Sequence, residues 1–170
     1  MDSRHYHFEG DGPRIHGNAY VSREATLVGD VTVESNANVW PGAVLRGDVG
    51  PVRVGRESHV GENTAIHVST VGERSMVASG AVLNDADVGD GVLVGFNATV
   101  NDCEVGEGSI VAAGAVVLGS TAVPPESFVS GVPASTRPLS ETNLDAAGLF
   151  EAYSTGKYAN LAARHEELFE

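Results

Sequence analysis

Residues 54–104 consist of three consecutive segments of equal length: VGRESHVGENTAIHVST (54–70), VGERSMVASGAVLNDAD (71–87) and VGDGVLVGFNATVNDCE (88–104). Each begins with Val-Gly and carries aliphatic residues at its first, seventh and thirteenth positions, so the spacing is six, six and five, a period of 17. Neither the 3.6-residue period of a helix nor the strict alternation of a long strand fits this spacing. The segments are therefore repeats of a unit built from hexapeptides.

The aliphatic spacing continues in both directions from these repeats. Earlier and later members of the series are Ile15, Val21, Leu27, Val33, Val39 and Leu45, and Val105, Val111 and Val117, with an irregular insertion around Gly50-Pro51-Val52. Each hexapeptide can form a short strand and a corner, and three of them make one triangular coil with its aliphatic residues inside. Stacking coils at a strand spacing of about 4.8 Å buries a continuous aliphatic column. The sequence predicts an all-β parallel β-helix of about seven coils over residues 15–133.

The two ends depart from the repeat. Residues 1–14 form an N-terminal segment leading into the coils, in which His5 and His7 alternate on an extended strand. Residues 134–170 are expected to form a C-terminal linker and a helix, because apolar residues between Asn143 and Phe169 recur at mostly helical intervals. We expect this helix to be interrupted near Gly156, and either to pack on a flat side of the prism or to cap a neighbouring subunit.

The formal net charge of −13 argues against nucleic acid or an anionic membrane surface as partner, because like charges repel. Nine of the ten basic residues are Arg and only Lys157 is Lys, which favours adaptation to concentrated salt over an ordinary acidic cytosolic protein.

Cys103 is the only cysteine, so no intrachain disulfide can form, and a role as a small turn residue explains it better than a role as a reactive thiol. Without a signal-like or membrane-spanning apolar run, the sequence predicts a cytoplasmic protein with no membrane insertion.

The 17-residue period converts sequence into geometry, because residues 17 apart occupy equivalent sites on adjacent coils. One column contains His67, Asn84 and Asn101, with Arg46 in the same role on the earlier, irregular coil. A second column contains Glu62, Ser79 and Phe96. Both columns lie next to the inward aliphatic residues, so their side chains are predicted to point outward from the prism.

Several motifs together resemble the gamma-class carbonic anhydrases and their homologues. They are NVWPGAVLRGD (38–48), VGRESHVGENTAIHV (54–68), GAVL (80–83), GSIVAAGAVV (108–117) and SGVPA (130–134), and the likeness runs from RIHGNAYVS (14–22) to YANLAARH (158–165). The resemblance implies a left-handed β-helix and a homotrimer with zinc at each subunit interface, bound by three histidines. In that family, zinc-bound hydroxide attacks carbon dioxide to form bicarbonate. His67 corresponds to one ligand, while Ser79 and Asn84 stand where the other two histidines are expected.

These departures predict a degraded metal site. Zinc is bound by imidazole, thiolate or carboxylate, and a hydrating enzyme needs three such ligands and a bound water, whereas Asn and Ser are weak zinc donors. We expect little or no tightly bound zinc and weak or absent hydratase activity. A weak site built from His67, Asn84 and water stays open, and it would favour oxygen-accepting cations.

Other positions of the resemblance are retained unevenly. Arg46 and Asp48 match a pair that ties neighbouring subunits together near the metal, although an interface salt bridge alone explains them equally well. Glu62 stands in place of an Asp and is either a proton acceptor or a solvated or Arg-paired carboxylate. His59 and Gly61 also replace family residues. The remaining histidines lack the column relation to His67 and are assigned surface or packing roles: His5, His7, His16 and His165.

Three functions remain open. The first is a carbonic anhydrase-like trimer with a degraded site, acting as a scaffold or assembly subunit. The second is an active anhydrase with a rearranged metal site, using carbon dioxide and bicarbonate. The third is a hexapeptide acyltransferase using acyl-CoA, which the near absence of Lys and the lack of an inserted loop between residues 54 and 117 disfavour.

Overall fold

The structure is a computed structural model that describes residues 3–155 and 160–166. Its strands are β1 (Arg4–Tyr6), β2 (Arg14–Ile15), β3 (Tyr20–Val21), β4 (Thr26–Val33), β5 (Asn38–Val39), β6 (Val44–Val54), β7 (His59–Val60), β8 (Ala65–His67), β9 (Thr70–Val71), β10 (Met76–Val77), β11 (Val82–Val88), β12 (Leu93–Val94), β13 (Thr99–Val105), β14 (Ile110–Val111), β15 (Val116–Val117), β16 (Ser127–Gly131) and β17 (Ala134–Pro138). A 3-10 turn (Leu139–Glu141) and the helices α1 (Ala146–Ser154) and α2 (Leu161–Glu166) follow.

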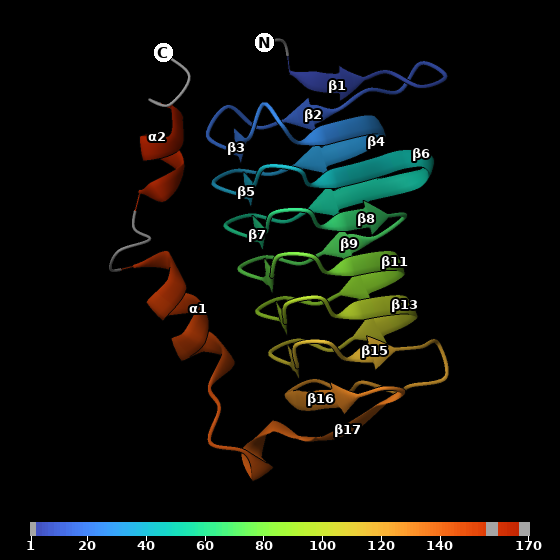
Figure 1. Cartoon of the computed structure of the whole chain (residues 1–170), viewed down its shortest axis with the longest axis vertical. Helices are drawn as coiled ribbons and strands as arrows, with labels where there is room; N and C mark the ends of the chain where they lie inside the picture. Colours follow the sequence, from blue (N-terminus) through green and yellow to red (C-terminus); the bar gives the residue numbers. More distant parts are fainter. Residues whose placement is uncertain (1–2, 156–159, 167–170) are drawn as a thin grey trace.

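The strands stack as the rungs of a parallel β-helix (Figure 1). One sheet has the order β3-β5-β7-β10-β12-β14-β16 and forms one side of the prism, one strand for each of seven coils. The other sheet contains β4, β6, β11 and β13, which continue around a corner and so form the remaining two sides. The predicted parallel β-helix of about seven coils is confirmed.

The interior consists of columns of stacked aliphatic side chains, here called ladders, and the strand pairing has the register that the sequence spacing predicts. Leu45 pairs with Ile66 and Ile66 with Leu83, and Leu83 pairs with Val100. All four side chains have no exposed surface. Burying each aliphatic side chain contributes roughly 1.5–3 kcal/mol, so the ladders are the main favourable term in the stability of the coils.

The corners are turned by residues in the left-handed backbone conformation. At one corner the residues with positive φ are Gly42, Asn63, Gly80, Asn97 and Gly114, so Gly and Asn alternate from coil to coil. The reason is contact between coils, because a Cβ on Gly80 would clash with the side-chain amide oxygen of Asn97. Gly and Asn are the residues that adopt this conformation at least cost, so the alternation satisfies both the turn and the packing.

Buried serines satisfy the backbone at another corner. The Ser58 hydroxyl donates to Gly72 O at 2.6 Å and accepts from Ser75 N at 2.9 Å, and the Ser75 hydroxyl accepts from Val92 N at 3.1 Å. Both serines are fully buried. Because unpaired buried backbone groups are costly, these hydroxyls are structural, and they supply no reactive group to the surface.

Three regions differ from a uniform repeat. The insertion near residue 50 is absorbed within β6, where Val52 is buried opposite Val31 after a register shift. The expected N-terminal strand is β1, which pairs in parallel with β4. Residues 134–138, expected to be linker, instead form β17, which pairs antiparallel with β16 because the chain reverses at residues 132–133.

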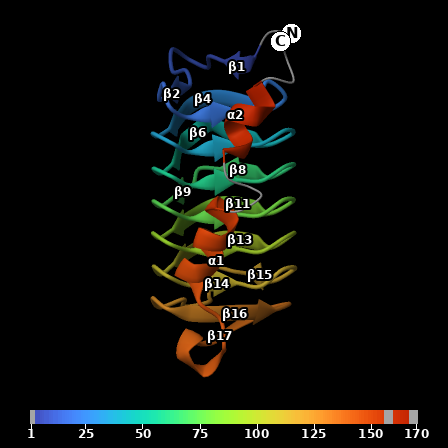
Figure 2. The same cartoon turned by 90° about the vertical axis from the view of Figure 1, so that its left-hand side faces the viewer.

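The C-terminal helices lie along the side of the prism made by β3 to β16 (Figures 1 and 2). Phe150 and Ala146 of α1 pack against Leu93 and Ile110, which point outward from this sheet. Packing of the helical tail on a flat side is thus the arrangement seen, while the break predicted near Gly156 lies outside the described residues. No helix in the described ranges is long and apolar enough to span a membrane.

His59 of β7 lies beneath α1. Its ring centroid is 5.5 Å from that of Phe150 and 4.9 Å from that of Tyr153, and Asn38 Nδ2 lies 3.0 Å from its Nδ1. Burial lowers the pKa of His59 from 6.5 to about 4, because the charged ring would lose its hydration. The charged residues Glu57 and Arg74, which form an ion pair of 3.0 Å, line the same cavity.

We therefore expect the free energy of unfolding to decrease as the pH falls, because His59 must take up a proton in a buried position. Because the unfolded chain binds a proton near pH 6.5 and the folded chain only near pH 4, the contribution is fully present above pH 6.5 and is lost between about pH 6.5 and 4. The shift corresponds to on the order of 3 kcal/mol. We expect thermal unfolding followed by circular dichroism to show a steeper loss of stability over this range in the wild type than in His59→Gln. The exposed His7→Gln serves as control, and equal slopes for all three proteins would contradict the assignment.

Candidate functional site

His67 lies in a row of polar side chains that crosses four adjacent coils. The strand register places Arg46 of β6 beside His67 of β8, His67 beside Asn84 of β11, and Asn84 beside Asn101 of β13. The column predicted from the 17-residue period is therefore confirmed. Each of these residues neighbours an inward aliphatic residue, which is why their side chains point away from the core.

Hydrogen bonds connect this row. Asn84 Nδ2 donates to Asn101 Oδ1 at 2.9 Å, and the Asn84 side chain also hydrogen bonds the His67 ring. Partial burial and the nearby Arg46 charge lower the pKa of His67, while Asp48 and the Asn84 hydrogen bond oppose that shift. The linked amide side chains of Asn84 and Asn101 thus lie on one side of the His67 imidazole.

Arg46 and Asp48 both lie on β6, two residues apart and hence on the same face. Arg46 Nε lies 3.0 Å from Asp48 Oδ1. The pair has ion-pair distance but not hydrogen-bond geometry, because the buried Oδ1 atom has no hydrogen-bond partner within the described part of the chain. This oxygen can accept a hydrogen bond from a donor outside the single chain.

Ser79 and Glu62 form a second cluster, just after strands β10 and β7 of the other sheet. Val60 pairs with Val77 and Val77 with Val94, so Glu62, Ser79 and Phe96 stand one above another as predicted. The Ser79 hydroxyl donates to Glu62 Oε2 at 2.6 Å. Glu62 is exposed and Phe96 is 60% exposed. The exposed carboxylate of Glu62 therefore accepts a hydrogen bond from the hydroxyl of Ser79.

The other histidines have separate surroundings. His165 of α2 packs edge-on against Trp40 with ring centroids 5.0 Å apart, and His16 Nδ1 accepts from the Asn18 backbone at 3.1 Å. Cys103 is buried, which raises its thiol pKa, so it is not poised as a nucleophile. Among residues 3–155 and 160–166, no group of three or more His, Cys, Asp or Glu side chains could hold a metal ion.

The donor set at the predicted ligand positions does not fit zinc. It consists of one imidazole, an amide that is hydrogen bonded to Asn101 and to that imidazole, and a hydroxyl that donates to Glu62. Zinc is bound by imidazole, thiolate and carboxylate groups, and the hydrogen-bonded amides of Asn84 and Asn101 are none of these. Of these three positions, only His67 carries a side chain of a type that zinc ordinarily binds.

The sequence did not reveal a second group of neighbouring side chains, Trp40 and His59, which lie under the C-terminal helices. The signal was present as a column of small residues on this side, Gly61, Ala78, Gly95 and Ala112, beside the outward apolar residues Met76, Leu93 and Ile110. Small side chains next to outward apolar ones leave a face that another element must cover.

Comparisons with known proteins give two kinds of relative. No family model matches the chain. It is 31% identical over 64 residues to a carbonic anhydrase of Geobacillus kaustophilus, covering 38% of this chain and 35% of that protein. It is 42% identical over 57 residues to gamma carbonic anhydrase-like 1, mitochondrial, of Arabidopsis thaliana, covering 34% of this chain and 23% of that protein. The matches thus span about a third or less of these relatives.

Whole-chain likeness comes from a solved structure. The crystal structure of a hexapeptide transferase family protein from Anaplasma phagocytophilum superposes with a TM-score of 0.85 and 27% identity, covering 96% of this chain and 98% of that one. The motifs of the resemblance, the named relatives and the superposed fold agree. The chain is a hexapeptide-repeat β-helix protein that is similar to gamma carbonic anhydrases over about a third of its length and to a hexapeptide transferase family protein over nearly all of it.

Proposed function

We propose that the chain forms a cytoplasmic, gamma carbonic anhydrase-like homotrimer whose ancestral site for carbon dioxide hydration is degraded. Hydratase activity is weak or absent, and the trimer serves as a scaffold or assembly subunit. The observation that carries this proposal is the hydrogen-bonded row at His67, in which Asn84 joins the imidazole to Asn101. A hydratase would need two further zinc ligands where this chain has Asn84 and Ser79.

The trimer is supported by the surroundings of Asp48. Its buried Oδ1 atom is in an ion pair with Arg46 but has no hydrogen-bond donor within the described residues of its own chain, and a buried acceptor without a hydrogen bond is costly. A donor from a neighbouring subunit would remove this cost. We expect light scattering to give a mass of three 17.6 kDa chains. A monomer at micromolar concentration would contradict the assembly.

Metal analysis and a hydration assay on the purified wild type test the degraded site. Zinc should be far below one ion per subunit after incubation with zinc and desalting, and the hydration rate should equal that of buffer. Stoichiometric zinc together with measurable hydration would instead establish the alternative, an active anhydrase with a rearranged site that uses carbon dioxide and bicarbonate.

The acyltransferase alternative is tested by the same preparation. Its support is the hexapeptide transferase neighbour, whereas the strand ladder from residue 54 to residue 117 contains no inserted loop that could carry a catalytic histidine. Acetyl-CoA should leave the melting temperature unchanged. A saturable increase would favour acyl transfer over the scaffold role.

A further inference from the structure

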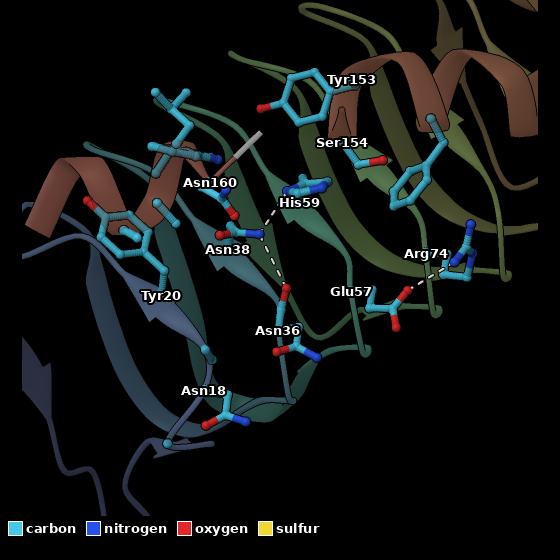
Figure 3. A pocket seen from close by; sticks show the side chains of 17 residues that line it. Asn18, Tyr20, Asn36, Asn38, Glu57, His59, Arg74, Tyr153, Ser154 and Asn160 are labelled. Atoms are coloured by element: carbon cyan, nitrogen blue, oxygen red, sulfur yellow. Dashed lines mark hydrogen bonds and ion pairs between the residues drawn. The ribbon is translucent and has the colours of Figure 1, made fainter. Parts of the chain in front are cut away.

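A cavity of about 570 Å³ lies between the sheet containing β3, β5 and β7 and the C-terminal helices. Its floor comes from Tyr20, Asn38 and His59, and its roof from the end of α1 and the start of α2 (Figure 3). This size falls within the range of small-molecule sites, roughly 300–1,000 Å³. The cavity is separate from the His67 row, which lies on the other sheet.

Trp40 contributes an unsatisfied donor to this cavity. The residue lines the cavity and is 4% exposed, and its Nε1 has no acceptor within the part of the chain that the structure describes. The ring is held by Tyr20 at 5.3 Å and His165 at 5.0 Å between centroids. A buried N–H without an acceptor costs about 1–3 kcal/mol, and an acceptor from a molecule bound in the cavity would offset this cost.

His59 contributes a second donor of fixed orientation. Asn38 Nδ2 donates to Asn36 O at 3.3 Å, which identifies it as the amide nitrogen, and the same atom lies 3.0 Å from His59 Nδ1 (Figure 3). Since the amide nitrogen can only donate, Nδ1 must accept. The neutral ring therefore carries its proton on Nε2, on the edge away from Asn38.

Among the described residues that line the cavity, the remaining polar groups carry no net charge. Besides Asn38, the side-chain amides are Asn18, Asn36 and Asn160, and the two ionic residues, Glu57 and Arg74, neutralise each other. Each amide can both donate and accept. Aromatic walls with paired donors and acceptors, and without free charge, suit a ligand that has apolar ring faces and hydroxyl groups.

We propose that this cavity binds an uncharged, polyhydroxylated small molecule of mono- or disaccharide size. Its hydroxyl oxygens accept from Trp40 Nε1 and His59 Nε2 and exchange hydrogen bonds with the amides, while an apolar ring face lies against the aromatic side chains. An anion is disfavoured because the cation Arg74 is already paired and the chain carries a net charge of −13.

The test uses the full-length protein with glucose, maltose and trehalose as probes, and adenosine and bicarbonate as competing classes. Trp40 is the single Trp of the chain, so its fluorescence in the unmodified protein reports on the cavity directly. We expect at least one sugar to give a saturable change with a dissociation constant in the millimolar range or tighter. No saturable change by fluorescence or calorimetry up to about 50 mM sugar would overturn the proposal, as would saturation by adenosine or bicarbonate alone.

Variants locate the binding. Trp40→Phe keeps an aromatic ring and removes the indole donor, and His59→Phe removes the imidazole donor, so each should weaken sugar binding about tenfold by calorimetry. Tyr6→Phe, which removes a hydroxyl from an exposed ring outside the cavity, should bind as the wild type does. Unchanged affinity in both cavity variants, with native circular dichroism, would overturn the assignment of this site.

Discussion

The double variant Ser79→His, Asn84→His is expected to bind one zinc ion per subunit, at least about a hundredfold more tightly than the wild type. His67 and residue 84 are already register partners on adjacent coils, so the second imidazole enters beside the first. The change also removes the amide that links His67 to Asn101 and the hydroxyl that donates to Glu62. Metal analysis after desalting, and the absorption spectrum of the cobalt-substituted protein, measure the result.

Matched controls separate a true site from added histidines. Each single variant supplies only two imidazoles and should bind zinc more weakly than the double variant. Phe96→His with Asn101→His places the same two substitutions one coil further along both columns, where residue 101 no longer adjoins His67. That variant should take up no stoichiometric zinc. A folded Ser79→His, Asn84→His protein that binds no more zinc than this control would show that the register across the subunit boundary is wrong.

The register itself was predictable from sequence, because the 17-residue period fixes which side chains adjoin. The row His67, Asn84 and Asn101 follows from the 17-residue spacing alone, and the strand pairs confirm it. Arg46 lies 21 positions before His67 on the irregular coil, and the strand pairing places it in the same row. In a β-helix each coil contacts only its neighbours, so local spacing determines most of the fold. The hydrogen bond between Ser79 and Glu62 was not predicted, since spacing gives adjacency and not the rotamers that bring two polar ends together.

The helical cover could not be predicted in the same way. The sequence indicated a C-terminal helix, but which side of the prism it would cover depends on contacts between distant residues, such as Phe150 with Leu93 and Ile110. The pairing of His165 with Trp40 crosses 125 positions, from residue 40 to residue 165, and no periodic pattern connects them. The cavity under the helices follows from that docking, and so does the burial of His59.

The largest loss of stability is expected for Ile66→Ala. Ile66 is fully buried between Leu45 and Leu83 in the ladder of the central coils. Deleting its outer atoms removes transfer free energy and leaves a cavity that stacked coils cannot close, because the strand spacing is fixed by backbone hydrogen bonds. We expect a loss of about 2–5 kcal/mol. For a chain of this length, that corresponds to a decrease of roughly 5–15 °C in melting temperature.

Two comparisons make this expectation specific to the ladder. Ile66→Val removes one methylene group and should cost only about 0.5–1.5 kcal/mol. Val132→Ala alters a residue that is 71% exposed and should leave unfolding unchanged within about 0.5 kcal/mol. All proteins must be compared at one concentration, since subunit association contributes to apparent stability. Because each coil buries its aliphatic residues only against its neighbours, an Ile66→Ala protein as stable as Val132→Ala would mean that the coils are not held together by this column.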